Sequence, residues 1–186
     1  RTELSEAEGR FTEEHMRDLG VKVHTGTSIA RVESQGGRVD GVVTESGERI
    51  RCDIVAVAVG VRPNTALAEK SGIDAGKGIR CGWDLFTGTE GIYTAGDCVE
   101  ISADRNGEGF VRTIWYSARD MGKTAGRNML GDGVRYDPGP WYNSAKFFEK
   151  EYTACGANRP DSSFEEYTYI AGDKTNSVRV VHENGT

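Results

Sequence analysis

The hydrophobic and polar positions along the chain change period several times, and each period predicts a different kind of element. Residues 5–20 carry apolar side chains at helical spacing and end in a glycine, which predicts a helix. Three short runs at 21–26, 27–34 and 38–47 read as strands. The last two alternate between apolar and polar residues and are separated by glycines, which predicts a half-solvated hairpin.

Residues 53–60 follow a different pattern. The run DIVAVAVG does not alternate, and it is continuously apolar and rich in β-branched residues. This pattern is typical of a strand that is buried on both faces of a parallel sheet. Pro63 ends the run, and residues 66–72 then predict two helical turns that end at Gly72.

The strongest helical pattern in the chain covers residues 111–131. Apolar residues recur there at helical spacing, and Gly131 closes the pattern; these residues are Ile114, Ala118, Met121, Ala125 and Met129. Before this helix, residues 78–97 read as short strands. After it, residues 132–143 contain two prolines and predict a linker at a domain boundary, followed by a small part rich in strands.

Length, charge and composition limit the classes of protein that need to be considered. A chain of 186 residues can form one ordinary domain or two small ones. The formal net charge of −6 argues against a general nucleic-acid binder. No stretch approaches the length of a membrane span and no signal peptide opens the chain, so we expect a cytoplasmic protein.

The cysteines and histidines predict neither a metal site nor a redox dithiol. The four cysteines form no C-x-x-C pair, and the three histidines are scattered; the cysteines are Cys52, Cys81, Cys98 and Cys155. We therefore expect reduced thiols, as is usual inside the cell.

Two glycine-containing turns, Gly60-Val61 and Gly96-Asp97, lie at the ends of predicted strands. In α/β sheets, ligands bind outside the carboxyl ends of the strands, and glycine lets a flat cofactor approach the backbone. Asp97 adds an acceptor for a sugar hydroxyl, and the start of the helix beyond it can face a carbonyl or a developing negative charge. Taken alone, however, Ala95-Gly96-Asp97 could equally be a turn with a capping aspartate.

The run TGTEGIYTAGDC at 87–98 resembles the second flavin-binding signature of the pyridine nucleotide-disulfide oxidoreductase family. The matching positions are Thr87, the pair Ile92-Tyr93 and the triplet Ala95-Gly96-Asp97. Many members have Pro where this chain has Glu90, a departure that affects the turn more than the ligand.

Two further segments resemble the same family, in the same order. Residues 53–73 resemble the return of the chain from the NAD(P)H domain to the flavin domain. Residues 115–131 resemble the helix after the signature in the NADH oxidase, rubredoxin reductase and nitrite reductase flavoprotein branches. The resemblance covers roughly residues 10–150.

The resemblance implies roles for six residues, which are Gly60, Val61, Gly96, Asp97, Ile114 and Trp115. Asp97 would accept a hydrogen bond from the ribityl chain of the flavin, and Gly96 would allow the approach. Backbone N–H groups around Ile114 and Trp115 would face the flavin pyrimidine edge, and Gly60 and Val61 would lie beside the nicotinamide. In the plainer interpretations, Trp115 is ordinary core, Gly60 is only a turn glycine and Cys98 is an inert thiol.

The fold implied by the resemblance is α/β, α+β in detail, as part of a flavoprotein with two dinucleotide-binding domains. Residues 1–62 would form the C-terminal half of the NAD(P)H-binding domain and 63–137 the C-terminal part of the FAD-binding domain. Residues 138–186 would begin a small β-rich interface domain.

A complete G-x-G-x-x-G turn is absent, because GKGIRC, GEGFVR and GDGVRY each lack the third glycine. We therefore expect a C-terminal fragment that is inactive by itself and binds FAD weakly or not at all.

The parent protein implied by the resemblance transfers a hydride from NAD(P)H to FAD and then passes electrons to an acceptor. That acceptor could be oxygen, a disulfide or persulfide, or a redox protein, and parents of this type often form homodimers. The catalytic residues and the choice between NADH and NADPH stay open. One alternative is a non-enzymatic α/β module for assembly or regulation with an idle flavin-signature remnant. Another is a signalling flavoprotein like the apoptosis-inducing branch.

Overall fold

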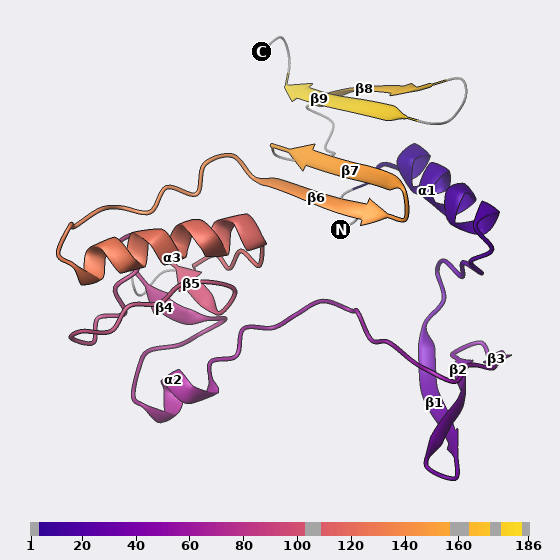
Figure 1. The fold of residues 1–186 in the computed structure, drawn as a ribbon, viewed down its shortest axis with the longest axis horizontal. Coiled ribbons are helices and arrows are strands. Elements are labelled where there is room, and N and C mark those ends of the chain that lie inside the picture. Colours follow the sequence, from indigo (N-terminus) through magenta and orange to yellow (C-terminus); the bar gives the residue numbers. More distant parts are fainter. Residues whose placement is uncertain (1–3, 103–108, 157–163, 172–175, 184–186) are drawn as a thin grey trace. The chain divides into compact units, whose positions relative to one another are not determined.

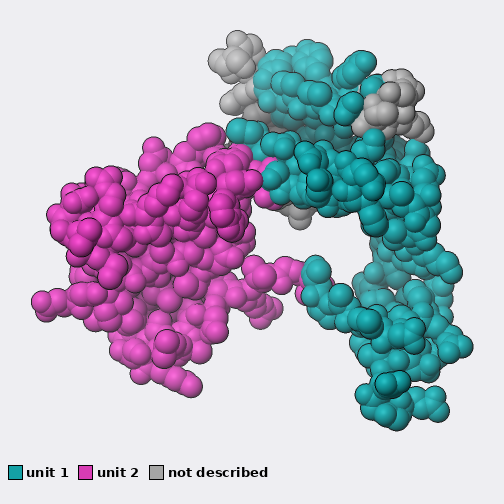
Figure 2. All heavy atoms as spheres, in the orientation of Figure 1, with its two compact units in different colours: residues 1–58, 144–186 teal, residues 59–143 magenta. Residues whose placement is uncertain are grey.

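The computed structural model describes residues 4–102, 109–156, 164–171 and 176–183. The chain divides into two compact units, one made of residues 1–58 and 144–186 and the other of residues 59–143 (Figure 2). The two units are described separately below.

Helix α1 (Glu6–Asp18) confirms the helix predicted over 5–20. Ser5 caps its start: the Ser5 hydroxyl accepts from the Glu8 backbone N–H at 3.3 Å, and the Glu8 carboxylate accepts from the Ser5 N–H at 2.8 Å. Glu8 also accepts a 2.9 Å hydrogen bond from Arg179 of strand β9 (Ser177–Glu183). Both side chains of this ion pair are largely buried, so it joins two distant parts of the sequence within one unit.

Strands β1 (Ile29–Gln35), β2 (Arg38–Thr44) and β3 (Arg49–Ile50) form an antiparallel sheet in that order. The predicted hairpin is confirmed. Gly36 and Gly37 connect β1 to β2 with φ angles of +58° and +77°, as the tightest hairpin turns require.

Ion pairs between charged side chains connect the strands of the same sheet. Arg49 on β3 donates to Glu33 on β1 at 2.7 Å, and Arg31 donates to the same carboxylate at 2.9 Å. The hydrogen bond from Arg49, followed by that from Arg31, lowers the pKa of Glu33.

Two strand predictions in this part of the chain are wrong. Residues 21–26 form no strand. Residues 53–60, which we expected to be buried on both faces of a sheet, also form no strand, and Figure 1 shows them as a bare connection between β3 and α2. Ile54 and Val59 are 84% and 89% exposed. A parallel strand needs neighbours along both edges and a layer on each face, and the described residues supply neither.

Residues 59–143 form a small α/β unit. It contains α2 (Ala66–Lys70), β4 (Ile79–Cys81), β5 (Val99–Ile101) and α3 (Trp115–Met129). Strands β4 and β5 pair in parallel, with Ile79 opposite Val99 and Cys81 opposite Ile101. Gly131, with φ +93°, follows the end of α3, as the sequence predicted.

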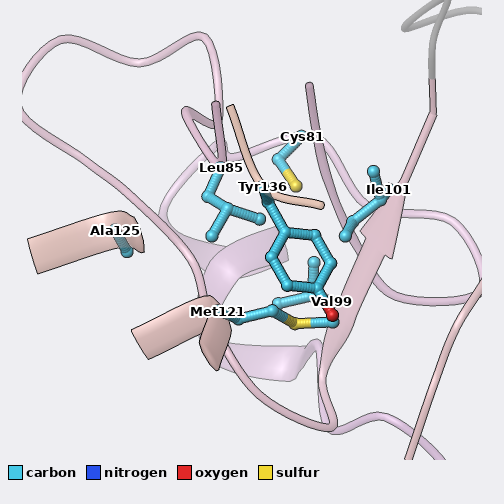
Figure 3. Packing of buried hydrophobic residues seen from close by; sticks show 7 residues of the cluster. All are labelled: Cys81, Leu85, Val99, Ile101, Met121, Ala125 and Tyr136. Atoms are coloured by element: carbon cyan, nitrogen blue, oxygen red, sulfur yellow. The ribbon is translucent and has the colours of Figure 1, made fainter. Parts of the chain in front are cut away.

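The core of this unit lies between α3 and the two strands. Figure 3 shows its seven buried residues, which are Cys81, Leu85, Val99, Ile101, Met121, Ala125 and Tyr136. Met121 and Ala125 confirm the apolar stripe predicted for the helix, whereas Met129 is 65% exposed. The core therefore connects the strand that follows Asp97 to the helix that begins at Trp115.

The last part of the described chain contains only strands. Strands β6 (Tyr142–Phe147) and β7 (Lys150–Cys155) form one pair. Strands β8 (Phe164–Ile170) and β9 form another, antiparallel pair, in which Tyr167 lies opposite Val180. The β-rich character predicted for this part is confirmed, while the proposed domain limits 1–62, 63–137 and 138–186 stay a prediction.

Candidate functional site

The triplet Ala95-Gly96-Asp97 forms a turn that leads into β5. The Gly96 carbonyl accepts from the Val99 N–H at 3.2 Å, and Gly96 has a φ of +98°, a conformation that favours glycine. The expectation that Asp97 ends a strand is wrong. Before the turn there is only an isolated bridge between Phe86 and Tyr93, and the strand begins after Asp97 because the chain must turn to run alongside β4.

The Asp97 carboxylate is exposed, and within the described ranges no residue hydrogen-bonds to it. Asp84, in contrast, caps a turn. Its Oδ1 accepts a hydrogen bond from the Phe86 N–H at 3.2 Å. The capping role considered for Asp97 therefore finds no support in this geometry. A Cβ placed on Gly96 would meet nothing within 4 Å, so the space beside the turn is open.

Buried threonines hold the segment that carries this turn. Thr87 Oγ1 donates to the Ile92 carbonyl at 2.9 Å, and the Thr94 N–H donates to the Leu85 carbonyl at 2.9 Å. Both threonines are 7% exposed. The signature threonine therefore has a structural role that the sequence reasoning missed. Glu90 is exposed within the loop that Thr87 closes.

The start of α3 has no side-chain cap among the described residues. Ile114 occupies the N-cap position with φ −132° and ψ 130°, and its carbonyl accepts from the Ala118 N–H at 2.9 Å. Its apolar side chain makes no capping hydrogen bond, and the first turn contains no acidic residue. The positive end of the helix dipole is therefore not neutralised by the helix itself, which favours a carbonyl or negatively charged ligand.

Trp115 lies in the first turn of α3 with 67% of its surface exposed, so its interpretation as ordinary core is wrong. Its ring lies nearly perpendicular to that of Tyr116 at a centroid distance of 5.3 Å, and the Arg119 guanidinium lies 5.3 Å from the Trp115 ring centre. Tyr116 in turn packs against Tyr142 at 4.5 Å. Arg119 also hydrogen-bonds Asp120 and thereby lowers the pKa of that carboxyl.

The described core does not link Gly60 and Val61 to the other candidate residues. Gly60 has a φ of +98° with open space around it, and Val61 is 70% exposed. All six candidates belong to the unit of residues 59–143. Only the Gly96-Asp97 turn and the α3 start are linked by a described core, through Val99 and Met121.

The geometry suits part of a flavin. An exposed carboxylate can accept from the hydroxyls of a polyol, an open glycine turn admits a flat ring, and an uncapped helix start can donate to carbonyl oxygens.

No group of three or more metal-binding side chains occurs among the described residues. Within the same residues, every helix is too short or too polar to cross a membrane.

Comparisons with known proteins point the same way. The family model described as pyridine nucleotide-disulphide oxidoreductase matches residues 2–122. A probable ferredoxin reductase of Castellaniella defragrans is 33% identical over 132 residues, which cover 70% of this chain and 32% of that protein. A rubredoxin-NAD(+) reductase of Alcanivorax borkumensis is 36% identical over 124 residues, covering 66% of this chain and 30% of the relative. The chain thus spans about a third of these relatives.

One solved structure shows the fold. The ferredoxin reductase for the CYP199A2 system from Rhodopseudomonas palustris superposes with a TM-score of 0.82 at 23% identity. The match covers 98% of this chain and 44% of that structure. The predicted α/β fold class, as part of a flavoprotein reductase fold, is confirmed.

Proposed function

The chain belongs to the pyridine nucleotide-disulphide oxidoreductase family, and we propose that it works as part of an FAD-dependent oxidoreductase that takes a hydride from NAD(P)H. Electrons then pass to an acceptor. The relatives named as ferredoxin and rubredoxin reductases support a redox protein as that acceptor, and a relative named NADH oxidase supports oxygen. The comparisons contain no observation that favours the non-enzymatic module.

The observation that carries this proposal is the exposed Asp97 carboxylate, to which none of the described residues hydrogen-bonds, beside the open Gly96 turn. Asp97 would accept hydrogen bonds from the ribityl hydroxyls. The carboxylate can do so only if no other side chain already donates to it. The backbone N–H groups at the start of α3, after Ile114, would face the carbonyl oxygens of the pyrimidine ring. FAD, when bound, supplies the ring that accepts the hydride.

The two remaining candidate residues are proposed to contact the nicotinamide. Gly60 and Val61 would lie beside that ring, where a glycine leaves room for a flat group. Both are exposed, which leaves them accessible. Their contacts with a cofactor are proposed on the family resemblance of residues 53–73.

The isolated chain is proposed to bind FAD weakly and to have no oxidoreductase activity. Its sequence contains no complete G-x-G-x-x-G turn, and such a turn normally holds the pyrophosphate of a dinucleotide. Without it, binding depends on the contacts to the ribityl chain and the ring. The purified chain should therefore be colourless, while added flavin should still bind in a saturable way.

The test is a titration of flavin fluorescence with the 186-residue chain, using riboflavin and lumiflavin as probes. Lumiflavin has the same ring system but carries a methyl group in place of the ribityl chain. Asp97→Asn should weaken riboflavin binding about tenfold, because it replaces a charged acceptor by a neutral amide with a single, weaker accepting oxygen. The same substitution should leave lumiflavin binding unchanged.

Asp132→Asn is the matched control, because Asp132 is an exposed aspartate of the same unit that pairs only with Arg127 in the described structure. It should change neither titration. Equal riboflavin binding by the wild type and Asp97→Asn would contradict the proposed charge-assisted ribityl contact. A yellow protein with one flavin per chain would contradict the weak binding.

A further inference from the structure

Glu100, on strand β5, is a buried acid to which the proposed flavin contacts assign no role. It is 3% exposed and follows Asp97 by three positions along the chain. One of its carboxylate oxygens accepts a hydrogen bond from the Gly78 N–H at 3.1 Å and lies 3.9 Å from Arg80 Nε. A buried carboxylate is costly unless it is paired and hydrogen-bonded, so these two contacts together allow Glu100 to be buried.

The segment that approaches Glu100 also contacts the residue directly after Asp97. The Ile79 N–H donates to the Cys98 carbonyl at 2.7 Å, where strands β4 and β5 begin to pair. A Cβ on Gly78 would lie 2.8 Å from the same carbonyl oxygen and 2.9 Å from the Glu100 nitrogen, closer than a real Cβ comes. Gly78 therefore lies directly against the backbone that leaves the Asp97 turn.

The Asp97 turn is closed by a backbone hydrogen bond, which the Val99 N–H donates to the Gly96 carbonyl at 3.2 Å. None of the described residues hydrogen-bonds to the Asp97 carboxylate itself. The direction of this carboxylate therefore follows from how the backbone is held on either side of it. Glu100 is a side chain that helps to hold the later side.

From these contacts we propose that Glu100 is a positioning residue for the ribityl chain of the flavin. By holding Gly78 against the start of β5, it fixes the turn from which the Asp97 carboxylate reaches the ribityl hydroxyls. This inference rests on the flavin contact proposed for Asp97. The hydrogen bond that Glu100 accepts carries the positioning rather than its charge, because a neutral oxygen can also accept from the Gly78 N–H.

The experiment measures riboflavin and lumiflavin binding by Glu100 variants of the 186-residue chain. Glu100→Ala should weaken riboflavin binding about fivefold, because the turn that carries Asp97 loses a support. Lumiflavin has no ribityl chain, so its binding should not change. Glu100→Gln keeps an oxygen acceptor for the Gly78 N–H and should bind riboflavin within about twofold of the wild type.

A double variant separates positioning from a general loss of stability. If Glu100 acts through Asp97, Glu100→Ala combined with Asp97→Asn should bind riboflavin no more weakly than Asp97→Asn alone. Asn128→Ala is the matched control, because Asn128 is also buried in this unit and donates to the Asp84 carbonyl at 2.7 Å. It should leave the ratio of the riboflavin and lumiflavin affinities unchanged.

A measurement on the wild type does not depend on the folding of any variant. Amide hydrogen exchange reports how often the Gly78 and Ile79 N–H groups lose their partners. Bound riboflavin should slow this exchange about fivefold more than bound lumiflavin does, because a contact at Asp97 and the support of its turn stabilise each other reciprocally.

Three results would overturn the inference while leaving the Asp97 contact in place. These are unchanged riboflavin binding by Glu100→Ala, equally weak binding by Glu100→Gln and Glu100→Ala, and a further loss in the double variant. Equal exchange of the Gly78 N–H with either flavin would also overturn it. If Asp97→Asn itself left riboflavin binding unchanged, the proposed contact and this inference would both be wrong.

Discussion

Asn128, near the end of α3, joins three parts of the 59–143 unit through one buried side chain. Its amide nitrogen donates to the Asp84 and Val134 carbonyls at 2.7 and 2.8 Å, and its oxygen accepts from the Val134 N–H at 2.7 Å. The side chain thereby satisfies all of these backbone groups at once. A buried backbone group that loses its partner is costly.

Asn128→Ala should lower the free energy of unfolding by about 2 kcal/mol, because it leaves buried carbonyls and an N–H without partners. Urea unfolding followed by tryptophan fluorescence measures this effect. Met129→Ala removes a larger side chain from the next position, which is 65% exposed, and should change stability by less than about 0.5 kcal/mol. Equal losses for the two variants would contradict the role assigned to Asn128.

Glu100 illustrates a residue whose burial the sequence did not reveal. It is 3% exposed, and its carboxylate accepts from the Gly78 N–H at 3.1 Å. A Cβ on Gly109 would lie 2.5 Å from Glu100 Cγ, and a Cβ on Gly76 would lie 2.7 Å from Glu100 Oε2. These glycines make room for the acid, a requirement set by segments that are distant in sequence.

At the scale of elements, α3 contains two interior glycines that no described neighbour requires. A Cβ on Gly122 or Gly126 would meet nothing within 4 Å. Glycine in a helix is less favourable than alanine, because it loses more backbone entropy on folding. The helix is therefore held by Met121 and Ala125 in the core rather than by its intrinsic propensity.

Gly122→Ala should stabilise the chain by about 0.5–1 kcal/mol, measured as an increase in the urea midpoint. Gly109→Ala is the informative contrast, because its Cβ would also lie 2.9 Å from the Ile101 carbonyl and should destabilise the chain. Destabilisation by Gly122→Ala would show that another group approaches this face of α3.

At the scale of the whole molecule, the two units differ in the spectroscopic probes that follow their unfolding. All three tryptophans, Trp83, Trp115 and Trp141, lie within residues 59–143. Tryptophan fluorescence therefore follows the unfolding of that unit, whereas far-UV circular dichroism follows both. Leu85 is fully buried in the core of the tryptophan-containing unit, and Val43 is 5% exposed in the other.

Leu85→Ala should lower the stability seen by tryptophan fluorescence by about 2–5 kcal/mol, because it leaves a cavity in the core. Val43→Ala should shift the circular dichroism transition while the fluorescence transition stays in place. If Val43→Ala shifted both transitions equally, the two units would unfold as one cooperative body rather than as two.

Local patterns predicted a large part of the candidate site. Glycines at positions 96 and 131 and the helical spacing of Met121 and Ala125 are short-range features, and the structure confirms the turn, the helix and its core face. The family followed from short motifs for the same reason, because the signature around Asp97 is contiguous in sequence. The cofactor roles of the six candidate residues stay predictions.

Burial and strand pairing were decided by the tertiary structure. The sequence of residues 53–60 specifies an apolar, β-branched run, but a strand exists only when another segment supplies hydrogen bonds and covering layers. The exposure of Trp115 and the burial of Glu100 likewise depend on what packs around them. Sequence alone thus determined where helices and turns form, because their hydrogen bonds are local. Which apolar and charged groups face water was decided by contacts between distant segments.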